Sequence, residues 1–313
     1  MRNIIYKSIA IILGIVFVDF SVGYFHNFIS AKLNENCRTG QAARANYAIN
    51  AVDADLLIIG SSPVMCGYNP QIFEDNLYGL TNEKWSVFDA SVSYQGIQFS
   101  EIALLSAIER GSIPKVVILD VSGDWLSQKV SERTLSTLHP YYKRNGYVTK
   151  FIDTFEDSKI KLFLKSNLWR CRGNFLELLV QFFKPGGSKG FDVSYNELTE
   201  DDENFEILKD DKPVISYNVA SFENIISTAK AYGIKLIVTI TPRLRYVDKE
   251  SASYRKMLEI CKRNQTPFYD YGNDTRFMHG EYFRDGLHLN AKGAEVYSQI
   301  VCETIKDILL INN

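Results

Sequence analysis

Five short apolar runs recur along the chain, and segments with helical periodicity separate them. A continuous apolar run that ends in a turn is typical of a strand buried on both faces of a parallel sheet. The runs are Ala54–Gly60, Trp85–Ala90, Lys115–Val121, Ile234–Ile240 and Pro267–Tyr271. Helical patterns cover about Pro70–Tyr78, Gln98–Arg110, Tyr217–Tyr232, Ser251–Asn264 and Ala291–Leu310. The alternation predicts an α/β fold with three layers, in which helices cover both faces of a doubly wound parallel sheet.

The N-terminal residues Ile4–Phe28 are almost wholly apolar or aromatic, and Arg2 and Lys7 lie at their N-terminal side. This length is enough to cross ~30 Å of hydrocarbon, and the positive flank places the N-terminus in the cytoplasm. We therefore expect a single-pass membrane anchor in residues 1–29, with the body outside the cytoplasm, in the periplasm or at the cell surface. Asp19 is costly at bilayer depth and could mark a contact with a partner.

Two other interpretations of this segment remain open. A cleaved signal peptide would end in a small-residue A-x-A site, which is missing after the apolar run. A buried core helix would leave the flanking charges and the terminal position unexplained.

The remaining chain divides into a spacer and one large domain. The polar, Ala- and Asn-rich segment at 30–52 is expected to hold the domain away from the membrane. Residues 53–313 form the α/β domain, which a mostly helical insertion at about 125–213 interrupts. The insertion carries the aromatic group His139–Tyr142, Trp169, the turn Pro185–Gly187 and an acidic run around Glu200–Glu203 that resembles a solvated loop.

Composition excludes several classes of protein. The chain has 313 residues, 46% of them hydrophobic, and a formal net charge of -2, which is typical of a globular protein. Nucleic-acid binding is disfavoured because the chain has no basic stripe. Five scattered cysteines without a C-x-x-C pair, and four histidines without H-E-x-x-H, favour a mechanism with no metal and no cofactor.

Two motifs at opposite ends of the domain carry candidate chemistry. The run Ile58–Ser62 ends the first predicted strand, and Asp285–Asn290 directly precedes the last helix. Both can reach the same edge of a doubly wound sheet. A hydroxyl nucleophile needs an adjacent base, and the base needs a third group that holds its tautomer. A D-x-x-H loop supplies base and orienting acid from one turn.

These motifs resemble blocks I and V of the SGNH, or GDSL-like, hydrolase superfamily, whose blocks are Gly-Asp-Ser or Gly-Ser-Ser after strand one and D-x-x-H before the final helix. The resemblance spans about residues 53–313. It implies a flavodoxin-like fold with Ser62 as nucleophile, His288 as base and Asp285 as orienting acid. The G-x-S-x-G elbow of α/β-hydrolases is absent.

Membrane-anchored proteins of this superfamily with Gly-Ser-Ser include proteins of alginate O-acetylation and of teichoic acid D-alanylation. The resemblance therefore implies a serine esterase or O-acyltransferase. Its substrate would be a small ester or an acylated cell-envelope glycan, with acetyl as the expected acyl group, and its partner would be a multi-span membrane acyltransferase.

The chain departs from the superfamily pattern at the oxyanion hole. A glycine after strand two is replaced near its position by Tyr94, with Gly96 two residues later. The expected asparagine after strand three is missing, and Ser122 and Asp124 are the remaining candidates there. Arg243, after the fourth strand, could meet an anionic group of a substrate.

Structural roles are open for each of these residues. Ser61 or Ser62 could cap a helix that Pro63 begins, and His288 could pack in a core. The incomplete oxyanion blocks favour a second hypothesis, in which the chain is an inactive glycan-binding or scaffold module for a multi-span partner. A third hypothesis, a cytoplasmic flavodoxin-like binding domain, is opposed by the anchor and by the D-x-x-H loop.

Overall fold

The computed structural model describes residues 2–35, 37, 40–184, 189–198, 212–244 and 247–310. Five parallel strands form one sheet in the order β2-β1-β3-β4-β5. The strands are β1 (Leu56–Ile59), β2 (Val87–Asp89), β3 (Val116–Asp120), β4 (Lys235–Ile240) and β5 (Phe268–Asp270). Each strand lies inside one of the apolar runs, and the order is that of flavodoxin-like sheets. The predicted fold class is confirmed.

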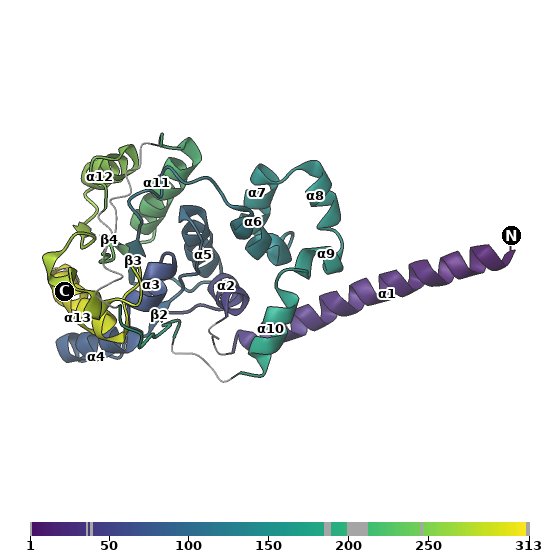
Figure 1. Ribbon diagram of the computed structural model, residues 1–313, viewed down its shortest axis with the longest axis horizontal. Helices are drawn as coiled ribbons and strands as arrows, with labels where there is room; N and C mark the ends of the chain where they lie inside the picture. The colour runs from purple at the N-terminus through teal and green to yellow at the C-terminus, as the bar shows by residue number, and fades with distance from the viewer. Residues whose placement is uncertain are drawn as a thin grey trace.

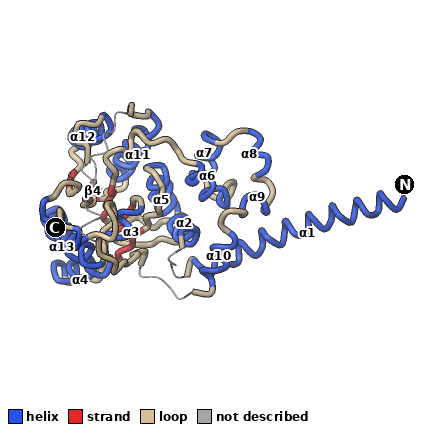
Figure 2. Tube along the Cα trace, viewed as in Figure 1, coloured by secondary structure: helices blue, strands red, loops and turns tan. Residues whose placement is uncertain are grey.

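Helices cover both faces of the sheet (Figures 1 and 2). One face carries α2 (Gln41–Asn50), α5 (Ile97–Glu109), α11 (Ser216–Ala231) and α12 (Ala252–Asn264). The other face carries α3 (Ser62–Gly67), α4 (Pro70–Thr81) and α13 (Ala291–Leu310).

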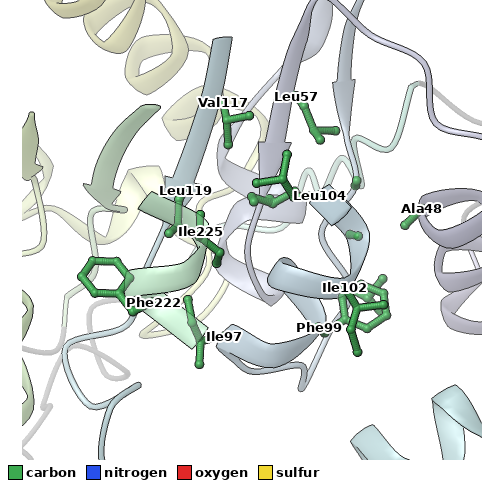
Figure 3. Packing of buried hydrophobic residues seen from close by; sticks show 14 of the residues in the cluster. Ala48, Leu57, Ile97, Phe99, Ile102, Leu104, Val117, Leu119, Phe222 and Ile225 are labelled. Atoms are coloured by element: carbon green, nitrogen blue, oxygen red, sulfur yellow. The ribbon is translucent and has the colours of Figure 1, made fainter. Parts of the chain in front are cut away.

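The alternation of strand side chains creates the two cores. Leu57 and Val117 point into the cluster with α5 and α11 (Figure 3), whereas their neighbours Leu56 and Val116 point into the cluster with α4 and α13. All four side chains are almost fully buried, and burial of such a side chain contributes about 1.5–3 kcal/mol. This explains why the strands are apolar runs without a polar face.

The insertion is mostly helical between Glu132 and Phe182, whereas its described residues 189–198 form no helix. Its elements are α6 (Glu132–Leu138), the 3-10 helix η1 (His139–Tyr141), α7 (Gly146–Phe155), α8 (Ser158–Phe163), α9 (Asn167–Cys171) and α10 (Phe175–Phe182). The expected turn at Pro185–Gly187 and the acidic run at Glu200–Glu203 lie outside the described residues.

The N-terminal helix α1 (Arg2–Leu33) projects away from the rest of the protein (Figure 1). It is long and apolar enough to cross a membrane by its length and composition. Residues 3–18 are exposed throughout, whereas the part of the helix from Asp19 onward contacts α9 and α10. Asp19 accepts hydrogen bonds from the Ser166 hydroxyl at 2.6 Å and from the Leu168 N–H at 2.9 Å.

The segment at 30–52 differs from the expected spacer. Residues up to Leu33 continue α1, and α2 packs against α5 in the main core, where Ala45, Ala48 and Ile49 are almost fully buried. The small alanine side chains, which made the segment look weakly hydrophobic, allow α2 to lie close to its neighbours. The chain after α1 is therefore an integral part of the domain.

Candidate active site

Ser62 lies in the tight connection between β1 and α3. Ser61 takes the N-cap position of α3, but its side chain makes no capping hydrogen bond, and Ser62 begins the helix. Gly60 lies so close to α3 and β3 that a Cβ atom would be 2.4 Å from Val64 Cγ2 and 3.0 Å from the Asp120 carbonyl oxygen. The glycine therefore lets the strand turn directly into the helix, with Ser62 at the carboxyl edge of the sheet.

The loop before α13 is closed by backbone contacts. Phe283 and Leu289 form an antiparallel bridge, and the Arg284 N–H donates to the His288 carbonyl oxygen at 3.0 Å. Asn290 then accepts a hydrogen bond from the Gly293 N–H through Oδ1, at 3.0 Å, and so caps α13. The loop is thus anchored at the start of the final helix and holds His288 in place.

Asp285 orients the imidazole of His288. Its Oδ1 accepts hydrogen bonds from the backbone N–H groups of Leu287 at 2.9 Å and His288 at 3.0 Å, and both carboxylate oxygens lie 2.8 Å from His288 Nδ1. This arrangement holds the proton on Nδ1 and leaves the Nε2 lone pair to accept. Nε2 lies 2.9 Å from Ser62 Oγ. Ser62, His288 and Asp285 therefore meet in the order that activation of a hydroxyl group requires.

The carboxyl group of Asp285 is held as an anion. Partial burial raises its pKa, but hydrogen bonds from the His288 ring and from the backbone of Leu287 outweigh burial, and the pKa falls to about 2. Arg284, which the sequence analysis did not single out, adds an ion-pair contact at 3.6 Å. The side chain of His288 is 16% exposed, so the base is sheltered but can still be reached from solvent.

A buried polar network lies at the same edge of the sheet. Asp120, the last residue of β3, accepts hydrogen bonds through Oδ2 from the hydroxyl groups of Tyr68 at 2.8 Å, Thr239 at 2.9 Å and Thr241 at 2.7 Å. Tyr68 OH also lies 2.8 Å from Tyr297 OH. Since Tyr68 ends α3 and Tyr297 belongs to α13, the network ties the helix of Ser62 to the helix that follows His288. Burial raises the pKa of Asp120 to about 6, although these hydrogen bonds lower it.

The loop after β2 carries the first two oxyanion candidates. Tyr94 has a φ of 62°, in the left-handed region that favours glycine, and its side chain is 65% exposed. Arg133 stacks on its ring at 4.0 Å from the centroid. Gly96 takes the N-cap position of α5. Because β2 neighbours β1 in the sheet, this loop flanks Ser62 on one side.

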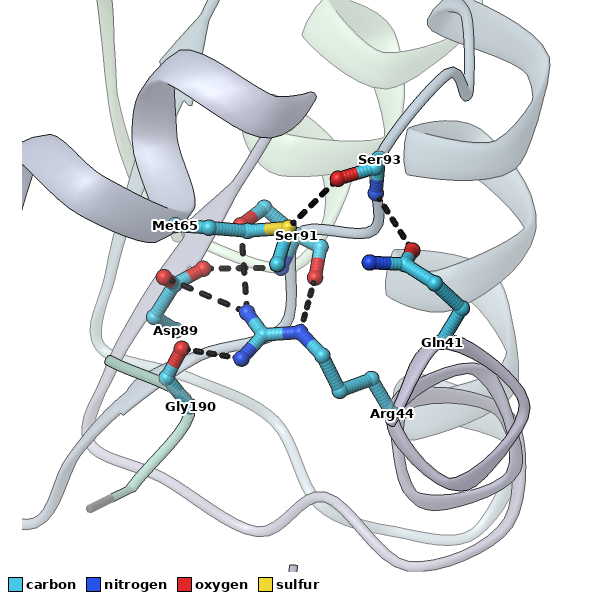
Figure 4. A network of polar contacts seen from close by, with 7 residues as sticks. All are labelled: Gln41, Arg44, Met65, Asp89, Ser91, Ser93 and Gly190. Atoms are coloured by element: carbon cyan, nitrogen blue, oxygen red, sulfur yellow. Dashed lines mark hydrogen bonds and ion pairs between the residues drawn. The ribbon is translucent and has the colours of Figure 1, made fainter. Parts of the chain in front are cut away.

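Residues of α2 hold that loop from below (Figure 4). Arg44 Nε donates to the Ser91 carbonyl oxygen at 3.0 Å, and its Nη2 lies 3.4 Å from Asp89 Oδ2. Gln41 Oε1 accepts from the Ser93 N–H at 2.9 Å. Neither Arg44 nor Gln41 was predicted, since their role depends on a long-range contact. A charged residue in an otherwise Ala- and Asn-rich helix was the one available signal.

The ion pair of Arg44 and Asp89 is fully enclosed. The two side chains are 2% and 0% exposed. Arg44 also donates to the Gly190 carbonyl oxygen, where the insertion returns to the domain. Gly190 has a φ of +88°, and a Cβ atom there would meet the Asp89 carbonyl oxygen at 1.9 Å. Burial raises the pKa of Asp89 to about 6, although the charge of Arg44 opposes this.

The three remaining candidates meet on the other side of β1. Ser122 Oγ donates to Asp124 Oδ1 at 2.6 Å, and Arg243 Nη1 donates to Ser122 Oγ at 3.3 Å. They follow β3 and β4, whereas Tyr94 and Gly96 follow β2. Since β1 lies between β2 and β3, the two groups lie on opposite sides of Ser62. Among the described residues, no group of three or more His, Cys, Asp or Glu side chains is placed to hold a metal ion.

Comparison with known proteins gives distant structural likenesses. No protein-family model and no curated protein matches the chain. The esterase EstA from Pseudoalteromonas sp. is similar over 82% of this chain and 98% of its own, with 12% identity and a TM-score of 0.41. A GDSL-like lipase from Bacteroides thetaiotaomicron covers 81% and 88%, with 11% identity and a TM-score of 0.37. An acetyl xylan esterase covers 82% and 100%, with 12% identity and a TM-score of 0.36.

Proposed function

We propose that the protein is a serine hydrolase or O-acyltransferase in which Ser62, His288 and Asp285 form the catalytic triad. The observation that carries the proposal is the distance of 2.9 Å between Ser62 Oγ and His288 Nε2, with Asp285 on the opposite ring nitrogen. A helix cap or a packing histidine would need neither contact. The pairing of a serine with an oriented imidazole is what nucleophilic acyl transfer requires.

The chemistry follows from this arrangement. His288 Nε2 removes the hydroxyl proton of Ser62 while Oγ attacks the carbonyl carbon of an ester, and the imidazolium is stabilised by Asp285. His288 then protonates the leaving alcohol, and an acyl-serine ester remains. Water or the hydroxyl group of an acceptor, deprotonated by His288, attacks this ester, and His288 returns the proton to Ser62 Oγ as the bond between Oγ and the acyl carbon breaks. Hydrolysis and transfer therefore differ only in the second nucleophile.

The substrate we propose is an acylated cell-envelope glycan, with acetyl as the acyl group. Support comes from the resemblance of the Gly-Ser-Ser and D-x-x-H motifs to those of envelope acyl-transfer proteins. The exposed Tyr94 ring beside the β2 loop is also suited to stack on a sugar ring. Arg243 has two buried guanidinium nitrogens, Nε and Nη2, that find no partner among the described residues, and Nη1 donates to Ser122. It is our candidate for contact with an acidic group of the glycan.

The proposed site is outside the cytoplasm, and α1 tethers it to the membrane. The length and exposure of α1 support the anchor, and the basic residues at its start support the orientation. Protease added to intact spheroplasts should degrade the domain, while the same treatment leaves a cytoplasmic marker intact. Full protection of the domain would contradict this topology and the envelope substrate with it.

Reaction with a fluorophosphonate probe tests the triad directly. The wild type and a Ser61→Ala variant should be labelled, whereas Ser62→Ala and His288→Ala should not. Ser61 is a matched control because it is the adjacent hydroxyl, one position earlier, with no hydrogen bond to the histidine. Labelling that survives Ser62→Ala would overturn the proposal. A wild type that is folded but unlabelled would favour the second candidate, an inactive glycan-binding module. The observation behind this candidate is the missing asparagine at the oxyanion hole.

A further inference from the structure

The insertion presents an unusual number of exposed apolar side chains. Six of them lie on or beside α8, α9 and α10, and Leu176 and Phe183 are 72% and 78% exposed. The set, called the insertion apolar surface below, is Leu162, Phe163, Leu168, Leu176, Val180 and Phe183. Single exposed apolar residues are normal on a protein, but a group of this size marks a surface that contacts something other than water.

This surface is continuous with the N-terminal helix. Helices α9 and α10 pack directly against α1 (Figure 1). The rings of Phe28 and Phe182 are 6.2 Å apart, and those of Phe182 and Phe183 are 5.2 Å apart. Phe20, Tyr24 and Phe25 of α1 are also more than half exposed. The apolar residues of the insertion therefore extend the apolar face of the helix.

The length of the exposed part of α1 implies that the bilayer reaches the insertion. The freely projecting part, residues 3–18, is sixteen residues long and rises about 24 Å, whereas a hydrocarbon core is ~30 Å thick. A spanning helix must therefore bury residues beyond Val18. Those residues include Asp19, whose carboxylate is held by Ser166 and by the Leu168 N–H at the start of α9. A carboxylate at this depth is tolerated because α9 supplies its hydrogen bonds.

The charges around the surface match a lipid boundary. Between Ser158 and Lys184 the exposed charged residues are all basic: Lys159, Lys165, Arg172 and Lys184. The one acidic residue in that interval, Glu177, is half-buried and accepts a hydrogen bond from the Ala42 N–H. The ring centroids of Trp169 and Phe163 are 4.8 Å apart, and the guanidinium group of Arg172 lies over the Trp169 ring, 4.0 Å from its centroid. Apolar side chains with a basic rim are the composition of elements that lie in the headgroup region.

We propose that α8–α10 form a second membrane contact, which lies in the interface of the same bilayer that α1 crosses and binds anionic lipid headgroups. This inference rests on the membrane anchor of the proposed function. The occupant is lipid rather than a protein partner, since the surface is continuous with the lipid-facing side of α1 and its exposed charges are basic apart from Asp157 at the start of α8. The contact prevents the domain from swinging on its tether, and so fixes the orientation of the Ser62 edge above the membrane.

Lipid-quenching experiments on the full-length protein test the contact. Phe163→Cys and Leu168→Cys variants carry an environment-sensitive fluorophore and are reconstituted into phosphatidylcholine vesicles with or without phosphatidylglycerol, containing a spin-labelled quencher lipid. Tyr78→Cys and Tyr232→Cys are matched controls, because both tyrosines are 52% exposed on the main domain. The insertion labels should shift to the blue and be quenched at least about twofold, more strongly with phosphatidylglycerol. The two controls should be unaffected.

A label at Val16 separates this inference from the anchor, and probe labelling of Ser62 in the same vesicles reports catalysis independently. Quenching at Val16 without quenching at Phe163 and Leu168 would overturn the insertion contact alone, whereas no quenching at Val16 would remove the anchor as well. Solvent-like insertion labels in pure lipid that become shielded in native membranes would overturn lipid as the occupant and indicate a protein instead.

Discussion

Ser62 Oγ and His288 Nε2 lie 2.9 Å apart although 226 positions separate the residues in the sequence. Two helices create this contact. Helix α3 begins at Ser62, α13 follows His288, and they pack against each other, with Gly67 of α3 beside Tyr297 of α13. The hydroxyl groups of Tyr68 and Tyr297 join the helices a turn or more from the site. The geometry of the triad is therefore a property of helix packing on one face of the sheet.

Asp285→Asn should lower kcat/KM on an activated ester by roughly 10³–10⁴-fold, because the amide no longer favours the proton on Nδ1 of His288. The remaining amide oxygen can still accept the two backbone hydrogen bonds, so the loop should keep its shape. Steady-state kinetics with p-nitrophenyl acetate measure the effect. Asp274→Asn is the matched control, since Asp274 caps a 3-10 helix through Arg276 N–H and lies outside the triad. Equal losses in both variants would contradict an orienting role for Asp285.

Hydrolysis of small esters should be weak relative to acyl transfer onto a glycan. Asp124, in the region where an asparagine donor is expected, accepts a hydrogen bond from Ser122 instead of offering one. Loss of one oxyanion donor costs ~100–1,000-fold in turnover, about 2.7–4 kcal/mol. A bound glycan could restore transition-state stabilisation through remote contacts that small esters lack. Ser122→Asn and Asp124→Asn variants, assayed with p-nitrophenyl acetate, test this. Rapid wild-type hydrolysis that neither variant improves would indicate a complete oxyanion hole.

Arg44→Met should destabilise the fold by about 3–5 kcal/mol, because it leaves the Asp89 carboxylate buried without its partner. The double variant Arg44→Met/Asp89→Leu should lose less, since no buried charge remains. Denaturant unfolding of the detergent-solubilised chain measures both, with Arg255→Met, an exposed arginine, as control. A single variant as stable as the control would show that the pair does not hold the β2 loop.

Asp120 should make stability depend on pH below neutrality. Burial raises its folded pKa to about 6, above the ordinary 3.8, so between these values the folded state binds more protons than the unfolded state. The stabilisation that Asp120 contributes to the folded state is therefore fully present below about pH 4. It is lost as pH rises through 6, where the free energy of unfolding falls by ~2–3 kcal/mol. The stability of the wild type relative to Asp120→Asn, from unfolding at pH 4.5 and pH 7.5, should fall accordingly. A difference that is constant with pH would contradict the raised pKa.

Local patterns determined most of the secondary structure. Each of the five strands falls within its apolar run, and α13 has the predicted bounds of Ala291–Leu310. These elements could be read because a strand buried on both faces needs a continuous apolar run, and an amphipathic helix needs its own periodicity. The Gly-Ser-Ser and D-x-x-H motifs were equally local, and the packing of α3 against α13 on one face of the sheet brings them together.

Other features were decided only by tertiary packing. The alanine-rich sequence of α2 is too weakly hydrophobic to predict that the helix is buried. The same small side chains allow α2 to lie close to α5. The sequence does not predict the ion pair of Arg44 and Asp89, because the two residues come from different elements. The same reason hides the three hydrogen bonds that Asp120 accepts from hydroxyl groups. In the sequence, Asp19 is a costly carboxylate within an apolar helix. In the structure, α9 lies beside it and supplies a hydrogen bond from the Leu168 N–H. A polar side chain can be buried only where the fold supplies its partners, and those partners are distant in the chain.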